Sequence, residues 1–109
     1  MLPTTVKVGP YIYSVSTNES ELRREETNGR VHLRGCTDSQ HLKIMIDATL
    51  AVGMQRQTLW HEVKHAIVDV LTMSNDKRSD EDWIARTAPM ELAVMRENPS
   101  LLAFMLGKD

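Results

Sequence analysis

The chain has 109 residues, 41% of them hydrophobic and 26% charged, which is enough for one compact domain over residues 1–109 and too short for two. Its 15 acidic residues against 13 lysines and arginines give no electrostatic reason to expect nucleic acid or an anionic membrane as a partner. No apolar run of about 18 residues and no secretory signal is present, so we expect a cytoplasmic protein. The single cysteine, Cys36, excludes an intrachain disulfide and a cysteine-pair zinc finger.

Before residue 48 the sequence predicts a small antiparallel β-sheet. Short segments of alternating β-branched or aromatic residues and polar residues are separated by turn residues, as in strands and hairpins. A polar connection follows the first segments, with a helical turn at 20–26 and the turn dipeptide Asn28–Gly29. In the last segment Leu42, Ile44 and Ile46 alternate with His41, Lys43 and Met45, so one face should belong to the core. The predicted strands are 6–8, 11–15, 31–36 and 41–47, with a turn at 37–40 between the last two.

From residue 48 the hydrophobic period lengthens from two to between three and four, which predicts helices. The first helix begins between Thr49 and Met54 and runs to about Met73. A loop at 74–78 ends it. The residues expected to face the core are Leu59, Val63, Ala66, Ile67, Val70 and Leu71.

A second helix begins after Ser79, a capping residue followed by acids that favour the positive end of a helix. Pro89 should kink or split this helix. Asn98, followed by proline, predicts a short last helix over 101–106 that ends at Gly107. Strands before helices indicate an α+β fold. The core-facing residues of the second helix should be Ile84, Ala88, Leu92 and Met95.

The first helix carries the motif His61-Glu62-Val63-Lys64-His65. Positions 61 and 65 lie one turn apart on nearly one face, so both imidazoles can bind one ion, and zinc accepts such neutral nitrogens readily. Glu62 lies to the side, where it can hydrogen-bond a water on that ion and act as a general base. These three residues predict a zinc site of the HExxH type.

The residues around the motif support this interpretation in part. Leu59 and Trp60 are uncharged and Ala66 and Ile67 are hydrophobic, as in zinc-binding helices, whereas the charge of Lys64 departs from the usual pattern. The alternative is that both histidines are ordinary polar residues on the solvent side of an amphipathic helix.

A catalytic zinc ion usually takes three protein ligands and one water. No histidine follows His65, so an acid of the second helix is the natural third ligand. If the two helices form an antiparallel hairpin, the first turn of the second faces the C-terminal part of the first. Glu81 is the predicted ligand, with Asp80 and Asp82 as alternatives. The other interpretation is an acid cluster that stabilises the helix N-terminus by up to about 1 kcal/mol.

Four further residues have both a functional and a structural interpretation. His32 and His41 could approach the ion or stabilise an oxyanion, although strand histidines more often lie at the surface. Asp69, one turn after His65, could orient a ligand imidazole or simply be solvated. We interpret Cys36 as a small buried apolar residue rather than as a nucleophile.

Together with the motif, the segments 35–44, 58–66, 80–85 and 97–99 resemble small phage or prophage proteins related to the ImmA/IrrE-type and minimal gluzincin metallopeptidases. The resemblance covers roughly residues 31–106, and only its HExxH motif is specific. It implies a minimal zincin-like fold in which a Glu opening the next helix, here Glu81, is the third zinc ligand. It also implies that the strand before the motif, here 41–46, holds an extended substrate by backbone pairing.

The expected function is hydrolysis of a peptide bond by zinc-bound water, with Zn²⁺ held by His61, His65 and Glu81 and with Glu62 moving the proton to the leaving amine. The partner would be a peptide or protein substrate, in the cytoplasm of a bacterial host if the protein is phage-encoded. A competing hypothesis is a catalytically silent, zinc-stabilised binding or regulatory module. A third is a metal-free helical interaction protein that uses its Met- and Leu-rich C-terminus.

Overall fold

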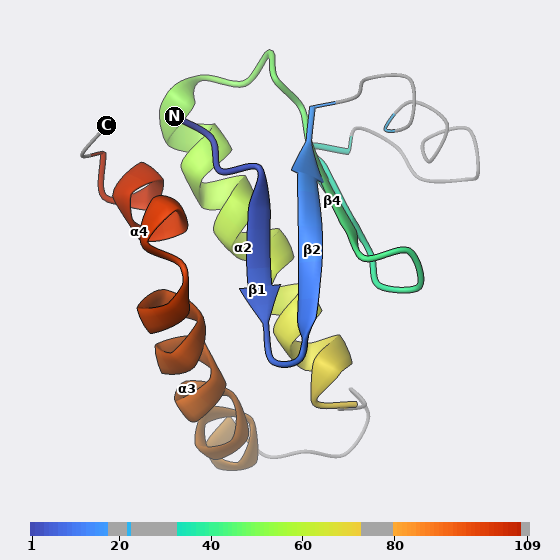
Figure 1. Cartoon of the computed structure of the whole chain (residues 1–109), viewed down its shortest axis with the longest axis vertical. Helices are drawn as coiled ribbons and strands as arrows, with labels where there is room; N and C mark the ends of the chain where they lie inside the picture. The colour runs from blue at the N-terminus through green and yellow to red at the C-terminus, as the bar shows by residue number, and fades with distance from the viewer. Residues whose placement is uncertain (18–21, 23–32, 73–79, 108–109) are drawn as a thin grey trace.

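The computed structural model describes residues 1–17, 22, 33–72 and 80–107, and in these residues a four-stranded sheet precedes three helices (Figure 1). The α+β class is therefore confirmed. The polar connection predicted before residue 30, with its helical turn, lies outside the described residues except for Leu22. The loop at 74–78, Ser79 and His32 also lie outside them. The elements are β1 (Thr5–Val8), β2 (Tyr11–Ser16), β3 (Gly35–Asp38), β4 (Lys43–Ile46), α2 (Val52–Val70), α3 (Asp80–Glu97) and α4 (Pro99–Met105).

The strand order is β1-β2-β4-β3, and the central pair of strands is parallel. β1 pairs antiparallel with β2, and β3 pairs antiparallel with β4. The prediction of a purely antiparallel sheet is therefore wrong. The long connection between β2 and β3 explains the difference, because such a connection can return the chain to either end of a sheet, whereas a tight turn enforces antiparallel pairing.

β4 lies inside the sheet, and β3 forms one of its edges. Thr37 and Asp38 belong to β3, so the turn predicted at 37–40 lies at 39–42 instead. The prediction that segment 41–46 pairs with a substrate is also wrong, because β4 is already hydrogen-bonded to β2 on one side and to β3 on the other. A substrate strand would have to pair with β3.

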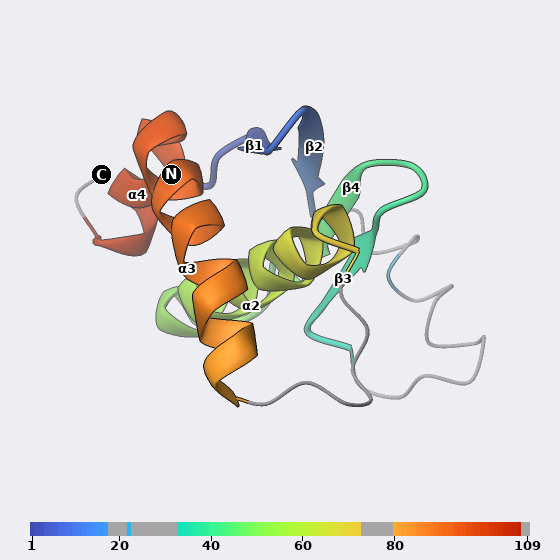
Figure 2. The same cartoon turned by 90° about the horizontal axis from the view of Figure 1, so that it is seen from below.

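The core lies between one face of the sheet and α2, while α3 and α4 lie on the β1 side (Figure 2). The apolar stripe predicted for α2 is confirmed, since four of its residues are buried and Val70 and Leu71 pack half-buried against them. On the other face of the sheet, Leu22 packs on Cys36 and Met45, so β4 is buried on both faces. The core residues are Val6, Val8, Tyr13, Val15, Ile44, Ile46, Leu59, Val63, Ala66, Ile67, Val94, Leu101 and Phe104.

α3 buries a different face from the predicted one. The side chains of Ile84 and Leu92 are 59% and 54% exposed, and Ala88 is exposed as well. Val94 is buried instead, and Met90 packs half-buried against the core. The helix also continues through Pro89 without being split. The carbonyl that this proline leaves without an amide partner is that of Ala85, which faces solvent, so water can satisfy it.

Asn98 joins the α3–α4 junction to the outer edge of β1. Its Oδ1 accepts from the Lys7 amide at 2.7 Å, and its Nδ2 donates to the Lys7 carbonyl at 2.9 Å and the Val94 carbonyl at 2.7 Å. Asn98 holds the predicted N-cap position of α4, but its side chain makes no capping bond there. The outward backbone groups of β1 at Lys7 are therefore already occupied.

Candidate metal centre

His61 and His65 lie side by side on the exposed face of α2. Their Nε2 atoms are 3.2 Å apart, and their ring planes meet at 72° with centroids 4.8 Å apart. Two nitrogen ligands at about 2.0–2.1 Å from one tetrahedral zinc ion would be separated by about 3.3 Å. The pair thus has the spacing of two ligands of one ion. The same spacing also allows one neutral imidazole to donate a hydrogen bond to the other.

Glu62 turns away from solvent toward β3 and is only 6% exposed. The Thr37 hydroxyl lies 2.8 Å from its Oε1 and 3.0 Å from its backbone oxygen, and can donate its single proton to either. Within the described part of the chain, the other carboxylate oxygen, Oε2, has no hydrogen-bond partner. Buried carboxylate oxygens are normally partnered, so Oε2 is an acceptor without a partner among the described residues, in a side chain that lines the same hollow as His61.

Gly35 lets β3 approach α2 closely at this point. A Cβ atom on Gly35 would lie 2.8 Å from Cγ2 of Thr58, closer than real Cβ atoms approach, and 3.1 Å from Cγ of Glu62, which is also a tight contact. Beside this contact is a hollow of about 270 Å³ that reaches both His61 and Glu62. Its lining residues are Leu33, Arg34, Gly35, Gln57, Thr58, His61 and Glu62.

The outer edge of β3 borders this hollow. The Asp47 amide donates to the Arg34 carbonyl directly opposite, so this bond shows which residue pairs between β3 and β4 are hydrogen-bonded. Because bonded and non-bonded residues alternate along an antiparallel ladder, Gly35 and Thr37 direct their backbone N–H and C=O groups away from β4. No described strand pairs with that edge.

The third ligand is not gathered with the histidines. Among the described residues, no three His, Cys, Asp or Glu side chains form a group that could hold a metal ion. Glu81 is exposed in the first turn of α3. The α3 residues that line the groove between α2 and α3 all come later in the chain, from Trp83 onward. Asp82 also precedes that groove, and the side chain of Asp80 is outside the described part.

Glu91 is the α3 carboxylate that lines this groove, opposite Lys64 of the motif. The groove has a volume of about 460 Å³, and α2 and α3 run in roughly opposite directions along it (Figure 1). Within the described residues the side chains of Glu91 and Lys64 make no hydrogen bond or ion pair. The sequence did not indicate Glu91, because the acid cluster at 80–82 favoured a ligand in the first turn of α3. Thr37 was missed because that residue was assigned to a turn.

Two further polar groups lie near the C-terminal end of α2. Asp69 accepts from the Ser39 hydroxyl at 2.5 Å, and Ser39 accepts from the Tyr13 hydroxyl at 3.1 Å. His41 pairs with Asp38, at 2.8 Å between Nδ1 and Oδ2. Although partial burial of Asp38 opposes the effect, hydrogen bonds from the His41 ring and amide lower the pKa of its carboxyl. The structure thus places Asp69 and His41 in contacts with the β3–β4 turn.

Tyr13 should make the stability of the fold sensitive to alkaline pH. Burial, reinforced by the negative charge of Asp69, raises the pKa of its hydroxyl despite the hydrogen bond to Ser39. A raised folded pKa gives stability that is complete below the unfolded value of about 10 and is lost as the pH rises through the folded value. We expect Tyr13→Phe to flatten the fall in unfolding free energy between about pH 9 and 12 in urea titrations. Tyr11→Phe, at a side chain that is 47% exposed, is the matched control and should change that fall much less, because Tyr11 is the smallest of the influences on the Tyr13 hydroxyl.

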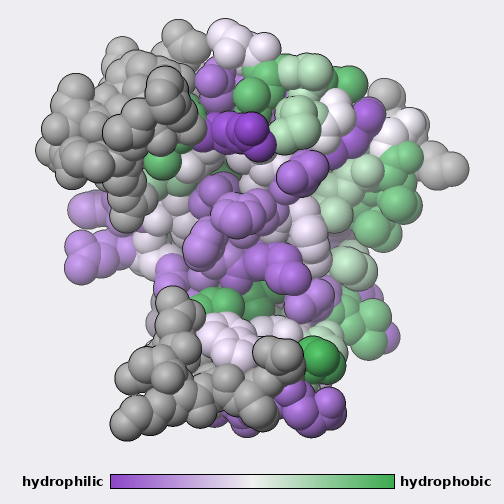
Figure 3. Space-filling view, turned by 180° about the vertical axis from the view of Figure 1, so that it is seen from behind, coloured by the Kyte–Doolittle hydropathy of each residue, from purple (hydrophilic) through white to green (hydrophobic). Residues whose placement is uncertain are grey.

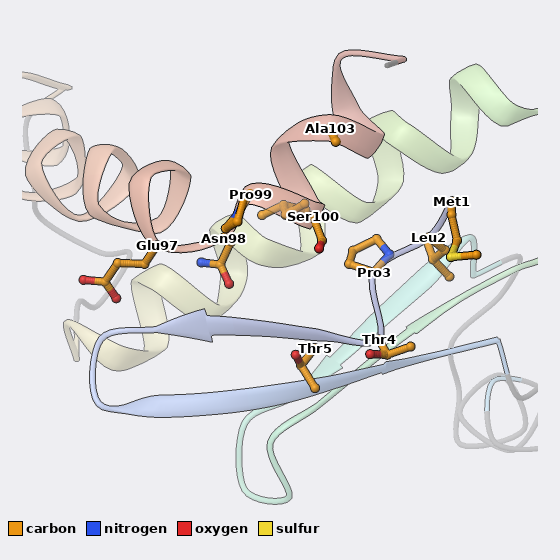
Figure 4. A pocket seen from close by; sticks show the side chains of 11 residues that line it. Met1, Leu2, Pro3, Thr4, Thr5, Glu97, Asn98, Pro99, Ser100 and Ala103 are labelled. Carbon is orange, nitrogen blue, oxygen red and sulfur yellow. The ribbon is translucent and has the colours of Figure 1, made fainter. Parts of the chain in front are cut away.

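Another hollow lies between the N-terminal segment and the α3–α4 junction (Figure 4). Its volume is about 520 Å³, but its carboxylate and its amide side chain are engaged elsewhere: Glu97 pairs with Lys7 at 2.6 Å, and all polar atoms of the Asn98 side chain are bonded. No convergent pair of ligands or titratable groups faces it among the residues described. The histidine pair therefore remains the candidate site.

Comparison with protein-family models, with curated proteins and with solved structures finds no match for this chain. No helix in the described ranges has the length and apolar character needed to cross a bilayer.

Proposed function

We propose that this chain is a zinc-dependent, metallopeptidase-like protein. The observation that carries the proposal is the pair of imidazole nitrogens 3.2 Å apart beside the buried Glu62, whose Oε2 has no partner among the described residues. Two neutral nitrogen donors on one helix face suit zinc, and the exposed position of both rings leaves room for a further ligand. The donor set therefore fits the metal.

In this proposal His61 and His65 hold the ion together with one carboxylate of α3. The resemblance assigns that ligand to Glu81. The position of Glu91, which lines the groove opposite Lys64 of the motif, favours Glu91 instead. When bound, zinc would supply Lewis acidity that polarises the carbonyl of the scissile peptide. If the protein is phage-encoded, as the resemblance implies, it would act in the cytoplasm of a bacterial host.

Glu62 and β3 supply the remaining chemistry. When the Thr37 hydroxyl donates to Oε1 of Glu62, Oε2 would remain to accept the proton of the attacking water and to pass it to the leaving amine. The outward N–H and C=O groups of Gly35 and Thr37 would pair with the backbone of an extended peptide laid along β3. Such a peptide would pass next to the hollow that His61 and Glu62 share.

A zinc-retaining module without hydrolysis is the second candidate. The contact between Thr37 and Glu62 favours this second candidate, because the contact gives the buried Glu62 a structural role that requires no chemistry. The two candidates agree on the metal and differ only in cleavage.

Zinc titration of the full chain tests the metal site. We expect one ion per chain, with His61→Ala and His65→Ala each weakening zinc binding by at least about 100-fold, since each removes one of only a few ligands. Glu81→Gln and Glu91→Gln identify the third ligand, because only the variant of the true ligand should lose affinity to a comparable extent. Glu97→Gln removes the same charge from a side chain that pairs with Lys7 of β1, and is the control. A parent chain that binds no zinc would contradict both candidates.

A further inference from the structure

The exposed face of α3 carries a stripe of apolar residues with an acid at one end and a base at the other. Steps of three or four residues place all its members on one side of the helix, over about 22 Å. Ile84 and Leu92 are among the most exposed large hydrophobic side chains of the described chain. Hydrophobic surface also gathers on the side of α3 and α4 in the view from behind, whereas hydrophilic residues cover the middle of that view (Figure 3). We call the residues Glu81, Ile84, Ala88, Leu92 and Arg96 the α3 stripe.

We propose that a second copy of this chain packs on the α3 stripe, with the two α3 helices antiparallel about Ala88. The stripe is complementary to itself in this orientation. Ile84 of one copy faces Leu92 of the other, and the small side chains of the two Ala88 residues meet at the centre and allow close approach. This inference does not rest on the proposed function.

The charges of the stripe select both the partner and the orientation. Glu81 and Arg96 are exposed and lie seven and eight residues from Ala88, on opposite sides of it. An antiparallel pair therefore brings Glu81 of each copy to Arg96 of the other, and it also opposes the two helix dipoles. A parallel pair would place like charges side by side at both ends.

The groove between α2 and α3 lies next to the α3 stripe and forms a concave part of this surface. Ile84 and Ala88 belong to both the stripe and the groove between α2 and α3, which Ile67, Val68 and Trp83 also line. A side chain from the partner copy can enter it. Because one helix pair buries less area than standard interfaces do, we expect a weak dimer with a dissociation constant on the order of 10 µM.

An ion pair between Glu81 and Arg96 would also exclude Glu81 as a metal ligand.

Sedimentation of the full chain, in buffer with EDTA so that metal does not contribute, tests the proposal. With rising concentration the mass should increase from 12.4 kDa toward twice that value. Ile84→Glu and Leu92→Glu should each weaken the dimer by at least about tenfold, because each buries an unpaired charge. Leu106→Glu, at a residue 60% exposed on the end of α4, is the matched control and should leave the dimer intact. Circular dichroism verifies that each variant is folded.

A charge exchange tests the orientation. Glu81→Arg and Arg96→Glu should each weaken association, and the double variant should restore it, because the exchange keeps opposite charges in contact. A parent chain that stays monomeric at all concentrations would overturn the proposal. So would a dimer that tolerates Ile84→Glu, or single charge variants whose defects simply add in the double variant.

Discussion

Replacing Glu62 with glutamine is expected to lower the rate of peptide hydrolysis by about two to four orders of magnitude, while zinc content stays unchanged. Glutamine has the same shape, and its carbonyl oxygen can still accept from the Thr37 hydroxyl, which lies 2.8 Å from Oε1. Its amide group would then take the place of Oε2 and cannot accept the water proton. The variant should therefore remain folded, keep its metal and lose general-base catalysis.

The assay is the release of new termini from a peptide library, identified by mass spectrometry at equal zinc loading of parent and variant. Glu97→Gln is the matched control, because it makes the same chemical change at a half-exposed side chain whose partner is Lys7. It should cleave as fast as the parent. Equal cleavage by the Glu62→Gln variant would exclude Glu62 as the base. A zinc-loaded parent that cleaves no peptide would instead support the silent module.

Local patterns in the sequence were sufficient to predict the helices and most of the strands. The i, i+4 spacing of His61 and His65 brings their Nε2 atoms together, as expected, because it depends only on the geometry of one helix. The stripe from Leu59 to Ile67 is buried for the same reason. Strand ends were less accurate, since Thr37 and Asp38 suit a turn as well as a strand.

Features that depend on contacts distant in sequence could not be predicted in this way. α3 has two apolar faces, one with Ile84 and Leu92 and one with Met90 and Val94, and only packing against α2 and β1 decides which is buried. The same packing of α3 against α2 places Glu91 opposite Lys64. The place of β4 inside the sheet depends on the connection before β3, whose sequence does not specify a partner strand.

Replacing Asn98 with alanine is expected to be the most destabilising polar substitution considered, at about 2–4 kcal/mol. The side chain is 8% exposed and makes three hydrogen bonds, two of them to Lys7 at the edge of β1. Alanine would leave the amide and carbonyl of Lys7 without these partners and would loosen the α3–α4 junction. Urea denaturation measures the loss, which for a chain of this size should lower the melting temperature by roughly 10–20 °C.

Two comparisons separate this effect from general disturbance of the junction. Glu97→Ala removes only an ion pair whose side chains are 48% and 44% exposed, and should cost about 0.5 kcal/mol or less. Asn98→Asp would place a carboxylate oxygen against the carbonyls of Lys7 and Val94, so at neutral pH it should destabilise at least as much as alanine. An Asn98→Ala variant as stable as the parent would show that these bonds do not hold α4 to β1.

The position of Asn98 also bears on where a substrate can bind. A sheet has two edges, and the outward groups of β1 at Lys7 are occupied by Asn98, whereas those of β3 at Gly35 and Thr37 border the hollow shared by His61 and Glu62. A peptide that pairs with the sheet, as proposed, would therefore do so at β3. Asn98→Ala should therefore reduce stability without changing zinc affinity or the cleavage rate per folded molecule, measured well below its lowered melting temperature. A matching loss of zinc affinity in the folded variant would mean that the β1 edge and the histidine pair are coupled, contrary to the arrangement proposed.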